Sequence, residues 1–206
     1  MSLPPPDLEP GASAALAART TARAADEGLA QVAYVTVDSP VGRLVAVHTS
    51  RGLARLAYEL ENGGLDEILD DVARRLSPAI VEAPARLDGV RRELDEYFDG
   101  RRRDFDLPLD WTLSSAGFRR RILQECARIP FGATSTYKAM AIAAGSPTAF
   151  RAAGGALGSN PIPIVVPCHR VLSSDGGLGG YTGGLDRKRR LLALEQGIGQ
   201  DALRAR

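Results

Sequence analysis

The pattern of apolar residues changes near the middle of this chain, and the change limits the folds open to it. Residues 32–37, 44–48 and 53–59 are short, mostly alternating runs with a turn signal at Ser39-Pro40-Val41-Gly42, which is typical of β-strands. From Ser114 onward the apolar residues recur at intervals of three and four, as on one face of a helix. Strands followed by helices predict an α+β protein with two lobes.

The first lobe is predicted over residues 31–110, as a small α/β unit with an antiparallel sheet. Amphipathic stretches at residues 65–76 and 84–98 predict two helices, and Phe105 to Leu109 predicts a returning edge strand. The second lobe, residues 111–206, is predicted to be helical over residues 114–129, 134–144 and 147–158. Since Gly145-Ser146 separates the last two segments, they predict a helix-turn-helix.

The ends and the composition of the chain add further expectations. Residues 1–30 contain Pro4-Pro5-Pro6, many alanines and few large apolar side chains, and predict a disordered tail. Hydrophobic residues make up 44% of the 206 residues, which is enough for a packed core. We find no signal peptide and no apolar run long enough to span a membrane, so we expect no membrane partner. The chain has only two cysteines and no obvious disulfide pairing, which favours a reducing, cytoplasmic compartment.

The net charge of +1 hides a division between the lobes. Through Asp110 the chain has 13 arginines and 20 acidic residues, whereas from Trp111 onward it has 13 basic and 5 acidic residues. A polyanion such as DNA is attracted to the second half and repelled by the first. The charge pattern therefore favours DNA as a partner, although a chance excess of solvated arginines would look the same.

The chemistry is expected at the end of a stiff, proline-punctuated segment, where Pro167 precedes Cys168 and His169. A free thiol is mostly protonated at neutral pH unless a base or a positive charge assists it. Glu195 follows Leu191 and Leu192 on one face of a predicted helix, and a carboxylate on an apolar face needs a partner. We therefore predict that Glu195 orients His169, which takes the thiol proton directly or through a water molecule. Each residue alone would fit a purely structural role.

Adjacent cysteine and histidine argue against a papain-like protease, where the two come from distant segments. The string Pro167-Cys168-His169-Arg170-Val171 instead resembles the hallmark of the O6-alkylguanine-DNA alkyltransferase family, the methylated-DNA–protein-cysteine methyltransferases. Further matches follow in family order between about residues 115 and 196: Ile129-Pro130-Phe131-Gly132 with Thr136-Tyr137, Arg151-Ala152-Ala153-Gly154-Gly155, Asn160-Pro161, Gly180-Tyr181-Thr182-Gly183-Gly184 and Leu191-Leu192-Ala193-Leu194-Glu195.

This resemblance implies DNA repair by irreversible transfer of the alkyl group of O6-alkylguanine, and of O4-alkylthymine as a further candidate substrate, from duplex DNA to Cys168. The protein would act once, as a monomer without a cofactor, and would associate with the nucleoid when bound to DNA. The target base must leave the helix to be reached. Tyr137 corresponds to the tyrosine that turns the phosphate and protonates the leaving guanine, and Arg151 to the arginine that fills the gap.

The resemblance also implies two sets of contact residues. The segment 147–158 carries mostly small residues, which would let its backbone enter a minor groove only about 6 Å wide, or would serve helix packing equally well. The DNA contacts implied are Thr136, Tyr137, Ala149, Phe150, Arg151 and Gly154. The pocket residues implied are Asn160, which ties the turn before the cysteine, Val165, Val171, Thr182 and Gly183 around the base, and Tyr181, which stacks on it.

Other interpretations make different predictions. Two cysteines and two histidines show no zinc-ligand spacing, and Cys126, within a helical stretch, reads as a buried apolar thiol. Phe150 stands where a small residue commonly faces DNA, and Ile122-Leu123 where many relatives have Val-Trp. A non-catalytic alkylation-damage binder would lack the nucleophile, and a helix-turn-helix regulator would explain the charge but not the residues around Cys168.

Overall fold

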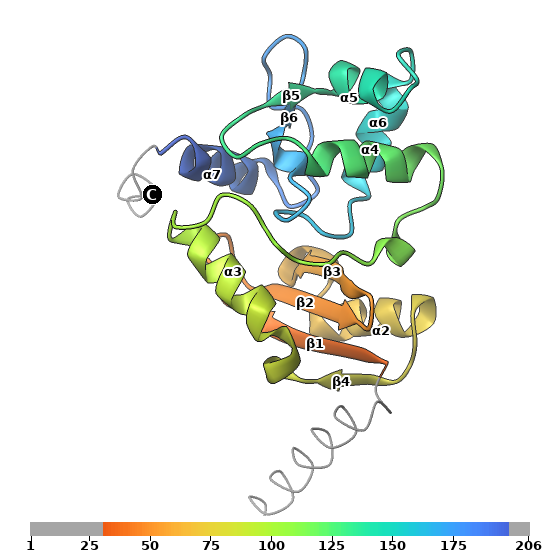
Figure 1. Ribbon diagram of the computed structural model, residues 1–206, viewed down its shortest axis with the longest axis vertical. Coiled ribbons are helices and arrows are strands. Elements are labelled where there is room, and N and C mark those ends of the chain that lie inside the picture. The colour runs from red at the N-terminus through yellow and green to blue at the C-terminus, as the bar shows by residue number, and fades with distance from the viewer. Residues whose placement is uncertain (1–30, 198–206) are drawn as a thin grey trace, which may run out of the picture.

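The computed structural model describes residues 31–197, which form two lobes lying side by side (Figure 1). The lobe of the earlier residues holds a sheet, and the other is mainly helical, so the predicted α+β class is confirmed. The tail predicted at residues 1–30 lies outside the described residues. No helix within residues 31–197 is long and apolar enough to cross a membrane.

The N-terminal lobe is built on a four-stranded sheet in the order β3-β2-β1-β4. Its strands are β1 (Val32–Val37), β2 (Leu44–Thr49), β3 (Gly52–Tyr58) and β4 (Ile80–Glu82). The first three pair antiparallel, as predicted. β4 was not predicted, and it pairs parallel to β1, so the sheet is mixed. With only three residues, none of them buried, β4 has no apolar alternation by which the sequence could reveal it.

Both faces of this sheet are covered. Val32, Val45 and Val47 point to one face, where they pack with Ile68 and Val72 of α2 (Leu65–Arg75). The alternate residues of the same strands point to the other face, toward η2 (Pro84–Leu87) and α3 (Asp88–Phe98). Figure 1 shows α2 and α3 on opposite sides of the strands. Because side chains alternate across a strand, one apolar run supplies both interfaces.

The outer edge of β3 is shared between two segments of the chain. The Leu53 amide donates to Pro108 O (2.8 Å), and the Leu56 amide donates to Pro161 O of the C-terminal lobe (2.9 Å). The predicted edge strand at residues 105–109 is therefore wrong, since only one isolated bridge, Leu53 to Leu109, forms there. The next bond along the edge belongs to the segment that precedes Cys168.

The C-terminal lobe contains η3 (Trp111–Leu113), α4 (Phe118–Ala127), α5 (Tyr137–Ala143), α6 (Phe150–Gly158), η4 (Cys168–Arg170) and α7 (Leu185–Glu195). The short parallel strands β5 (Ser135–Thr136) and β6 (Val171–Leu172) join the start of α5 to the segment after the cysteine. α4 to α6 begin three or four residues later than predicted. Gly117, at a φ of 76°, ends the extended chain before α4, and Thr136 caps α5 by accepting from the Ala139 amide (3.1 Å).

α5 and α6 form the predicted helix-turn-helix. Gly145 takes a φ of 78° between them, a conformation that costs glycine little, and its amide donates to Ile142 O (2.9 Å). The small residues of α6 divide between the two roles considered above: Ala153 and Ala156 are fully buried, while Ala152 and Gly155 face outward. One half of the pattern therefore serves helix packing and the other half forms an exposed surface.

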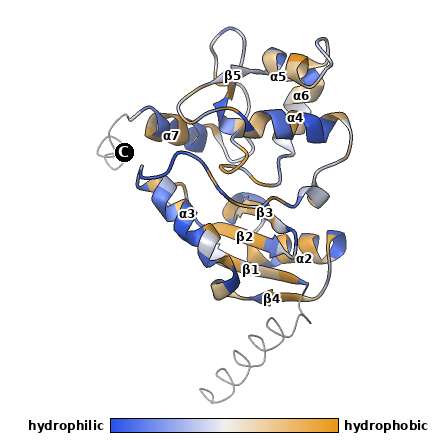
Figure 2. Cartoon of the chain, in the orientation of Figure 1, coloured by the Kyte–Doolittle hydropathy of each residue, from blue (hydrophilic) through white to orange (hydrophobic). Residues whose placement is uncertain are grey.

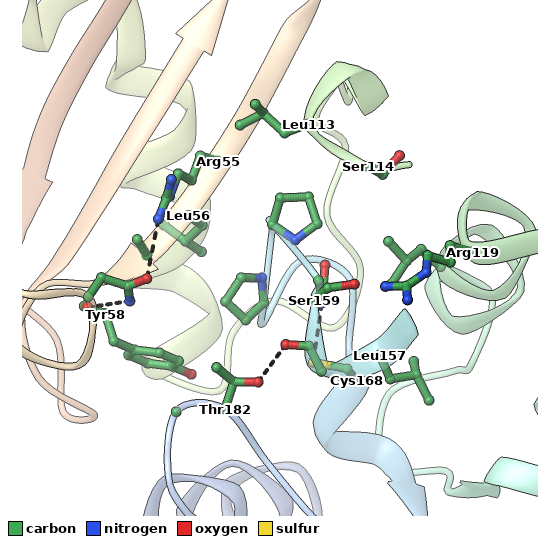
Figure 3. Close-up of a pocket in the computed structure, with 18 of the residues that line it drawn as sticks. Arg55, Leu56, Tyr58, Leu113, Ser114, Arg119, Leu157, Ser159, Cys168 and Thr182 are labelled. Carbon is green, nitrogen blue, oxygen red and sulfur yellow. Dashed lines mark hydrogen bonds between the residues drawn. The ribbon is translucent and has the colours of Figure 1, made fainter. Parts of the chain in front are cut away.

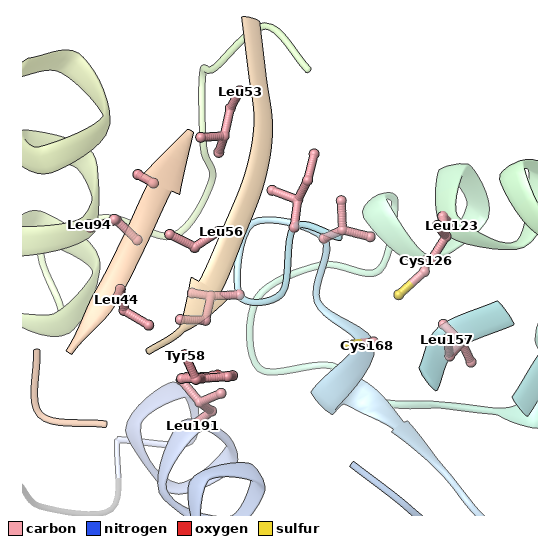
Figure 4. Close-up of a cluster of buried hydrophobic side chains, with 14 of the residues drawn as sticks. Leu44, Leu53, Leu56, Tyr58, Leu94, Leu123, Cys126, Leu157, Cys168 and Leu191 are labelled. Carbon is pink, nitrogen blue, oxygen red and sulfur yellow. The ribbon is translucent and has the colours of Figure 1, made fainter. Parts of the chain in front are cut away.

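The principal apolar core is continuous across both lobes. Leu44, Leu53 and Leu56 of the sheet belong to the same cluster as Leu123 and Leu191 of the C-terminal lobe, and Figure 4 shows them on either side of the segment that leads to Cys168. Figure 2 shows the same distribution in the ribbon, with hydrophobic strands inside and hydrophilic stretches on the outer helices. The active-site segment thus lies inside a shared core.

Candidate active site

The segment before the cysteine is held in a sharply bent conformation by one side chain. Asn160 Oδ1 accepts from the Ile162 amide (3.0 Å), and Asn160 Nδ2 donates to Val166 O (2.8 Å). Ile164, between them, has a φ of 74°, in a region that costs a β-branched residue about 1–3 kcal/mol. Ile164 is fully buried, so the surrounding core and the Asn160 bonds stabilise this conformation.

Cys168 begins η4, and its side chain is 8% exposed. Asn160 Nδ2 donates to Sγ (3.2 Å). Burial raises the pKa of the Cys168 thiol above its ordinary value, although the Asn160 bond and the positive charge of Lys188 act in the opposite direction. The thiol is therefore protonated at neutral pH until a base removes the proton, but groups that stabilise the thiolate are already in place.

His169 and Glu195 meet as predicted, although they lie on different elements. His169 Nε2 is 2.8 Å from Glu195 Oε1, and both side chains are at most 1% exposed. Burial lowers the pKa of His169, so the ring is neutral at neutral pH. A neutral ring that donates from Nε2 to the carboxylate has its lone pair on Nδ1. His169 Nδ1 has no hydrogen-bond partner within residues 31–197.

Glu195 is also the acceptor for three further groups. Arg170 donates from Nε to Oε2 and from Nη2 to Oε1, both at 2.9 Å, and Tyr97 donates its hydroxyl to Oε1 (2.7 Å). The Gly132 amide donates to Oε2 (3.2 Å). Burial favours the neutral acid, but the hydrogen bonds from His169 and Arg170 outweigh it and lower the pKa of Glu195 to about 2. The carboxylate therefore stays charged and fixes the imidazole.

Cys168 is reached from two cavities. The first, about 440 Å³, is lined only by the C-terminal lobe; we name it the base cavity. Its lining consists of Tyr137, Gly154, Leu157, Gly158, Cys168, Gly180, Tyr181 and Thr182. The second, about 300 Å³, lies between the lobes and is the inter-lobe cavity, shown in Figure 3. A substrate in the base cavity can therefore reach the Cys168 sulfur, and the inter-lobe cavity leaves free space next to the same sulfur.

Tyr137 stands at the first position of α5, against the glycine-rich loop of residues 176–184. Its hydroxyl makes a long hydrogen bond to Gly180 O (3.4 Å). Gly179, at a φ of 65°, leaves no room for a larger residue, since a Cβ there would be 2.6 Å from the Tyr137 hydroxyl. Burial raises the pKa of Tyr137, so the phenol retains its proton and is available as a donor.

Comparison with known proteins accords with this geometry. A family model described as the ribonuclease-like domain of 6-O-methylguanine DNA methyltransferase matches residues 32–111, and the model of the DNA-binding domain of that protein matches residues 117–197. The methylated-DNA–protein-cysteine methyltransferase of Mycolicibacterium paratuberculosis is 40% identical over 80% of this chain and 93% of its own length. That of Methanosarcina barkeri is 37% identical over 79% and 96%.

This chain belongs to the methylated-DNA–protein-cysteine methyltransferase family. Solved structures agree: Mycobacterium tuberculosis OGT in complex with DNA has a TM-score of 0.71 and 37% identity, covering 83% of this chain and 98% of that one. A second structure, of M. tuberculosis O6-methylguanine methyltransferase, has a TM-score of 0.69 and 36% identity, covering 82% of this chain and 94% of that one. The chain is accordingly a DNA-binding DNA-repair methyltransferase.

The DNA contacts expected from the family pattern all lie on the helix-turn-helix, with different surroundings. Phe150 is 46% exposed at the start of α6, and the Arg151 guanidinium lies 5.6 Å from the centre of its ring. Ala149 precedes them as the helix cap. Gly154 faces inward, where a Cβ would be 3.8 Å from the Tyr137 ring. The Thr136 hydroxyl is already used in capping α5.

The expected pocket residues fall into two groups. Tyr181 and Thr182 line both cavities, and Asn160 and Gly183 line the inter-lobe cavity. Val165 packs against the core, and Val171 is fully buried with its carbonyl accepting from Lys188 Nζ (2.7 Å). Neither valine lines the base cavity or the inter-lobe cavity.

Three functional contacts were missed from the sequence. Lys188 is fully buried, and its Nζ donates to the carbonyls of Val171 and Leu178, which ties the glycine-rich loop to β6. Lys188 shares a helix face with Leu191 and Glu195, so its spacing could have revealed this. Tyr97, in the N-terminal lobe, and the hydroxyl of Tyr58, 2.8 Å from that of Tyr181, had no comparable signal.

Side chains of the types that bind metal ions are scattered in the part of the chain that the structure describes. Within residues 31–197 no three His, Cys, Asp or Glu side chains gather so that they could hold a metal ion. Cys126 is fully buried, as expected, and burial raises the pKa of its thiol well above the ordinary value. Cys168 lines the base cavity and the inter-lobe cavity, and Cys126 lines neither.

Proposed function

We propose that Cys168 accepts the alkyl group of O6-alkylguanine from duplex DNA in a single irreversible step, and that His169, Glu195 and Tyr137 assist it. The observation that carries this proposal is the buried arrangement in which a neutral His169 is bonded to Glu195 at 2.8 Å, directly after a cysteine that opens onto the base cavity. O4-alkylthymine would be accepted only where the smaller ring still brings its alkyl carbon to the sulfur.

The proposed reaction begins with proton removal from the thiol. His169 Nδ1 accepts the proton through one water molecule, and Glu195 stabilises the imidazolium that forms. The thiolate attacks the alkyl carbon in line, so that an S–C bond forms as the C–O6 bond breaks. The electron pair stays on guanine, and the Tyr137 phenol supplies a proton to the departing base. Its raised pKa keeps that proton in place before the reaction.

Access to the base requires a nucleotide rotated out of the duplex. The exposed small residues Ala152 and Gly155 on α6 let the helix approach a minor groove closely, with Thr136, Ala149, Phe150 and Gly154 beside them. Arg151 occupies the space that the base leaves. Asn160 holds the turn, Tyr181 stacks on the base, and backbone groups near Val165, Val171, Thr182 and Gly183 read its edges.

A thioether is stable to hydrolysis, so each protein molecule acts once. We infer a monomer, because one chain holds every group named in the reaction. The two unpaired thiols suit a reducing compartment, which supports a cytoplasmic protein that joins the nucleoid on DNA.

The test is mass spectrometry of the intact protein and its peptides after incubation with a duplex that carries one O6-methylguanine. We expect one added methyl group per molecule, located on Cys168, and none with undamaged duplex. Cys168→Ala should still bind the damaged duplex, gain no methyl group, and leave Cys126 unmodified. Damage-selective binding by the wild type without any mass increase would point instead to a non-catalytic damage binder, and binding without selectivity to a regulator.

A further inference from the structure

The inter-lobe cavity is larger than transfer of a methyl group requires. Its volume is about 300 Å³, and Cys168 is one of its lining residues. Leu157, Pro163 and Leu123 give it an apolar part, and Ser114, Ser159 and Asn62 a polar part. Figure 3 shows Cys168 between Leu157 and Thr182, with β3 on one side of the cavity and α4 on the other. A chain attached to the reacting carbon has space to extend between the lobes.

The charges around this cavity are of one sign. Among its described lining residues are the guanidinium groups of Arg55, Arg75 and Arg119, and no lining residue is acidic. Arg55 and Arg75 share Asp71 as an ion-pair partner behind the lining. Arg119 has no ion-pair partner within residues 31–197, and the other two guanidinium groups share one carboxylate, so an excess of positive charge remains toward the cavity.

Arg119 is the arginine best placed to meet a ligand. It is exposed at the start of α4 and makes no hydrogen bond or ion pair within residues 31–197, whereas Arg55 is bound to Asp71 and Asn62 and Arg75 donates to Leu113 O (2.7 Å). Figure 3 shows Arg119 on the α4 side of the cavity and Arg55 on the β3 side. A guanidinium group with unused donors can bind a carboxylate through two parallel hydrogen bonds.

We propose that Arg119 makes the protein favour O6-alkyl groups that end in a carboxylate and whose chain extends from Cys168 into the inter-lobe cavity. This specificity rests on the proposed function, since the first carbon of the group must still reach Cys168. The bond from that carbon to Sγ forms as its bond to guanine O6 breaks, the electron pair leaves with guanine, and the carboxylate is unchanged. After transfer, the carboxyalkyl chain remains in the cavity as a thioether on Cys168.

The test compares matched pairs of substrates. Duplexes carry guanine whose O6 chain has from one to four methylene groups and ends either in a carboxylate or in its amide, which has the same shape without the charge. Single-turnover rate constants for the two give a carboxylate-to-amide ratio at each length. An O6-methylguanine duplex is measured in parallel, so that failure of methyl transfer would overturn the proposed function rather than the specificity.

We expect a ratio of about five or more at the best chain length, because a charge-assisted hydrogen bond is roughly twice as strong as a neutral one. In Arg119→Gln the ratio should fall to about one while the methyl rate is unchanged, and Arg119→Lys should keep part of it. Arg128→Gln, at the other end of α4 and outside the lining, should keep the wild-type ratio. A wild-type ratio of one or less at every length, or a ratio unaltered in Arg119→Gln, would overturn the proposal.

Discussion

The two lobes contribute to the site in different ways. Every residue that lines the base cavity comes from the C-terminal lobe, whereas the N-terminal lobe holds none of the groups assigned to the reaction. Yet Tyr97 of α3 donates to Glu195 (2.7 Å), Leu56 of β3 donates to the segment before Cys168, and Tyr58 bonds Tyr181 (2.8 Å). The C-terminal lobe supplies the chemistry, and the N-terminal lobe holds it in position from behind.

This difference explains how the buried pair of His169 and Glu195 can lie beside the open base cavity. Groups that contact DNA must be exposed, and exposed loops are held by few contacts of their own. They therefore need support from a neighbouring lobe. Arg187 links the glycine-rich loop to the N-terminal lobe. It donates to Gly183 O (2.9 Å) in the loop. In the N-terminal lobe it forms an ion pair with Glu61, and its guanidinium group lies 4.8 Å from the centre of the Tyr58 ring. The sheet lobe thus fixes the end of the glycine-rich loop near Gly183, while the middle of the loop, at Gly179 and Gly180, lies against Tyr137.

The largest effect is expected where both lobes meet the same carboxylate. Glu195→Ala leaves the buried Arg170 without its partner and removes the acceptor of Tyr97 and His169, so unfolding free energy should fall by about 3–5 kcal/mol and transfer should be abolished. Denaturant unfolding measures this. Glu125→Ala removes the exposed ion pair with Arg128 and should change stability by less than about 1 kcal/mol; equal losses in the two variants would contradict the account.

Tyr137→Phe tests the C-terminal lobe alone. The substitution removes the proposed proton donor but only one long hydrogen bond to Gly180, so the transfer rate should fall by about 100-fold with stability nearly unchanged. Single-turnover kinetics at saturating DNA give the rate. An unaltered rate would show that the departing guanine receives its proton from elsewhere.

Tyr97→Phe tests the N-terminal lobe alone. It removes one of the bonds to Glu195, and a hydrogen bond to a charged group contributes about 1.5–3 kcal/mol to stability. We expect a loss in that range, together with a transfer rate lowered several-fold at neutral pH because His169 is less firmly oriented. Tyr137→Phe is the comparison, because it should lose mainly transfer rate whereas Tyr97→Phe should lose mainly stability. If the two variants lose rate and stability in the same proportion, the assignment of chemistry to one lobe and positioning to the other is wrong.

The smallest effect is expected at Tyr58. Tyr58→Phe removes the hydrogen bond to the Tyr181 hydroxyl but retains the ring. The ring packs closely on Gly183, since a Cβ at that residue would lie 2.4 Å from it. Because only one neutral hydrogen bond is lost, the unfolding free energy should fall by about 1 kcal/mol and the rate by no more than about threefold. Tyr34→Phe, whose ring packs on the opposite face of the sheet, is the matched control and should leave the rate unchanged.

The sequence predicted the parts of this molecule that depend on local pattern. Alternation gave β1 to β3, and glycine at residue 145 gave the turn between α5 and α6, because these signals lie within a few residues of the element they specify. The His169–Glu195 pair was also predicted, since a carboxylate on an apolar helix face needs a partner. Tyr97 could not be assigned, because nothing in its own helix distinguishes a core tyrosine from one that bonds a residue 98 positions away.

The helix starts were missed for a related reason. Thr136 and Gly117 begin α5 and α4 only because their backbone conformations break the helical run, and a hydrophobic pattern does not record backbone angles. Lys188 stands in the run Arg187-Lys188-Arg189-Arg190, which has the composition of a solvated basic cluster, yet it is fully buried. Lys188 lies three residues before Leu191 and seven before Glu195, a spacing that puts all three on one helix face. Buried lysines are rare, however, so the sequence alone favours a solvent-exposed Lys188.

The most direct test of the relay is the pH dependence of transfer by the wild-type protein, measured under single-turnover conditions at saturating damaged DNA. Burial lowers the pKa of His169 below 6.5 and raises that of Cys168 above 9. A neutral His169 acting as base predicts a rate that is constant near neutrality and that falls only below pH 6.5, as the pH passes through the lowered pKa of His169 and the ring takes up a proton. A rate that instead climbs tenfold per pH unit from neutrality to pH 9 would mean that the thiol ionises unaided, and would contradict the relay.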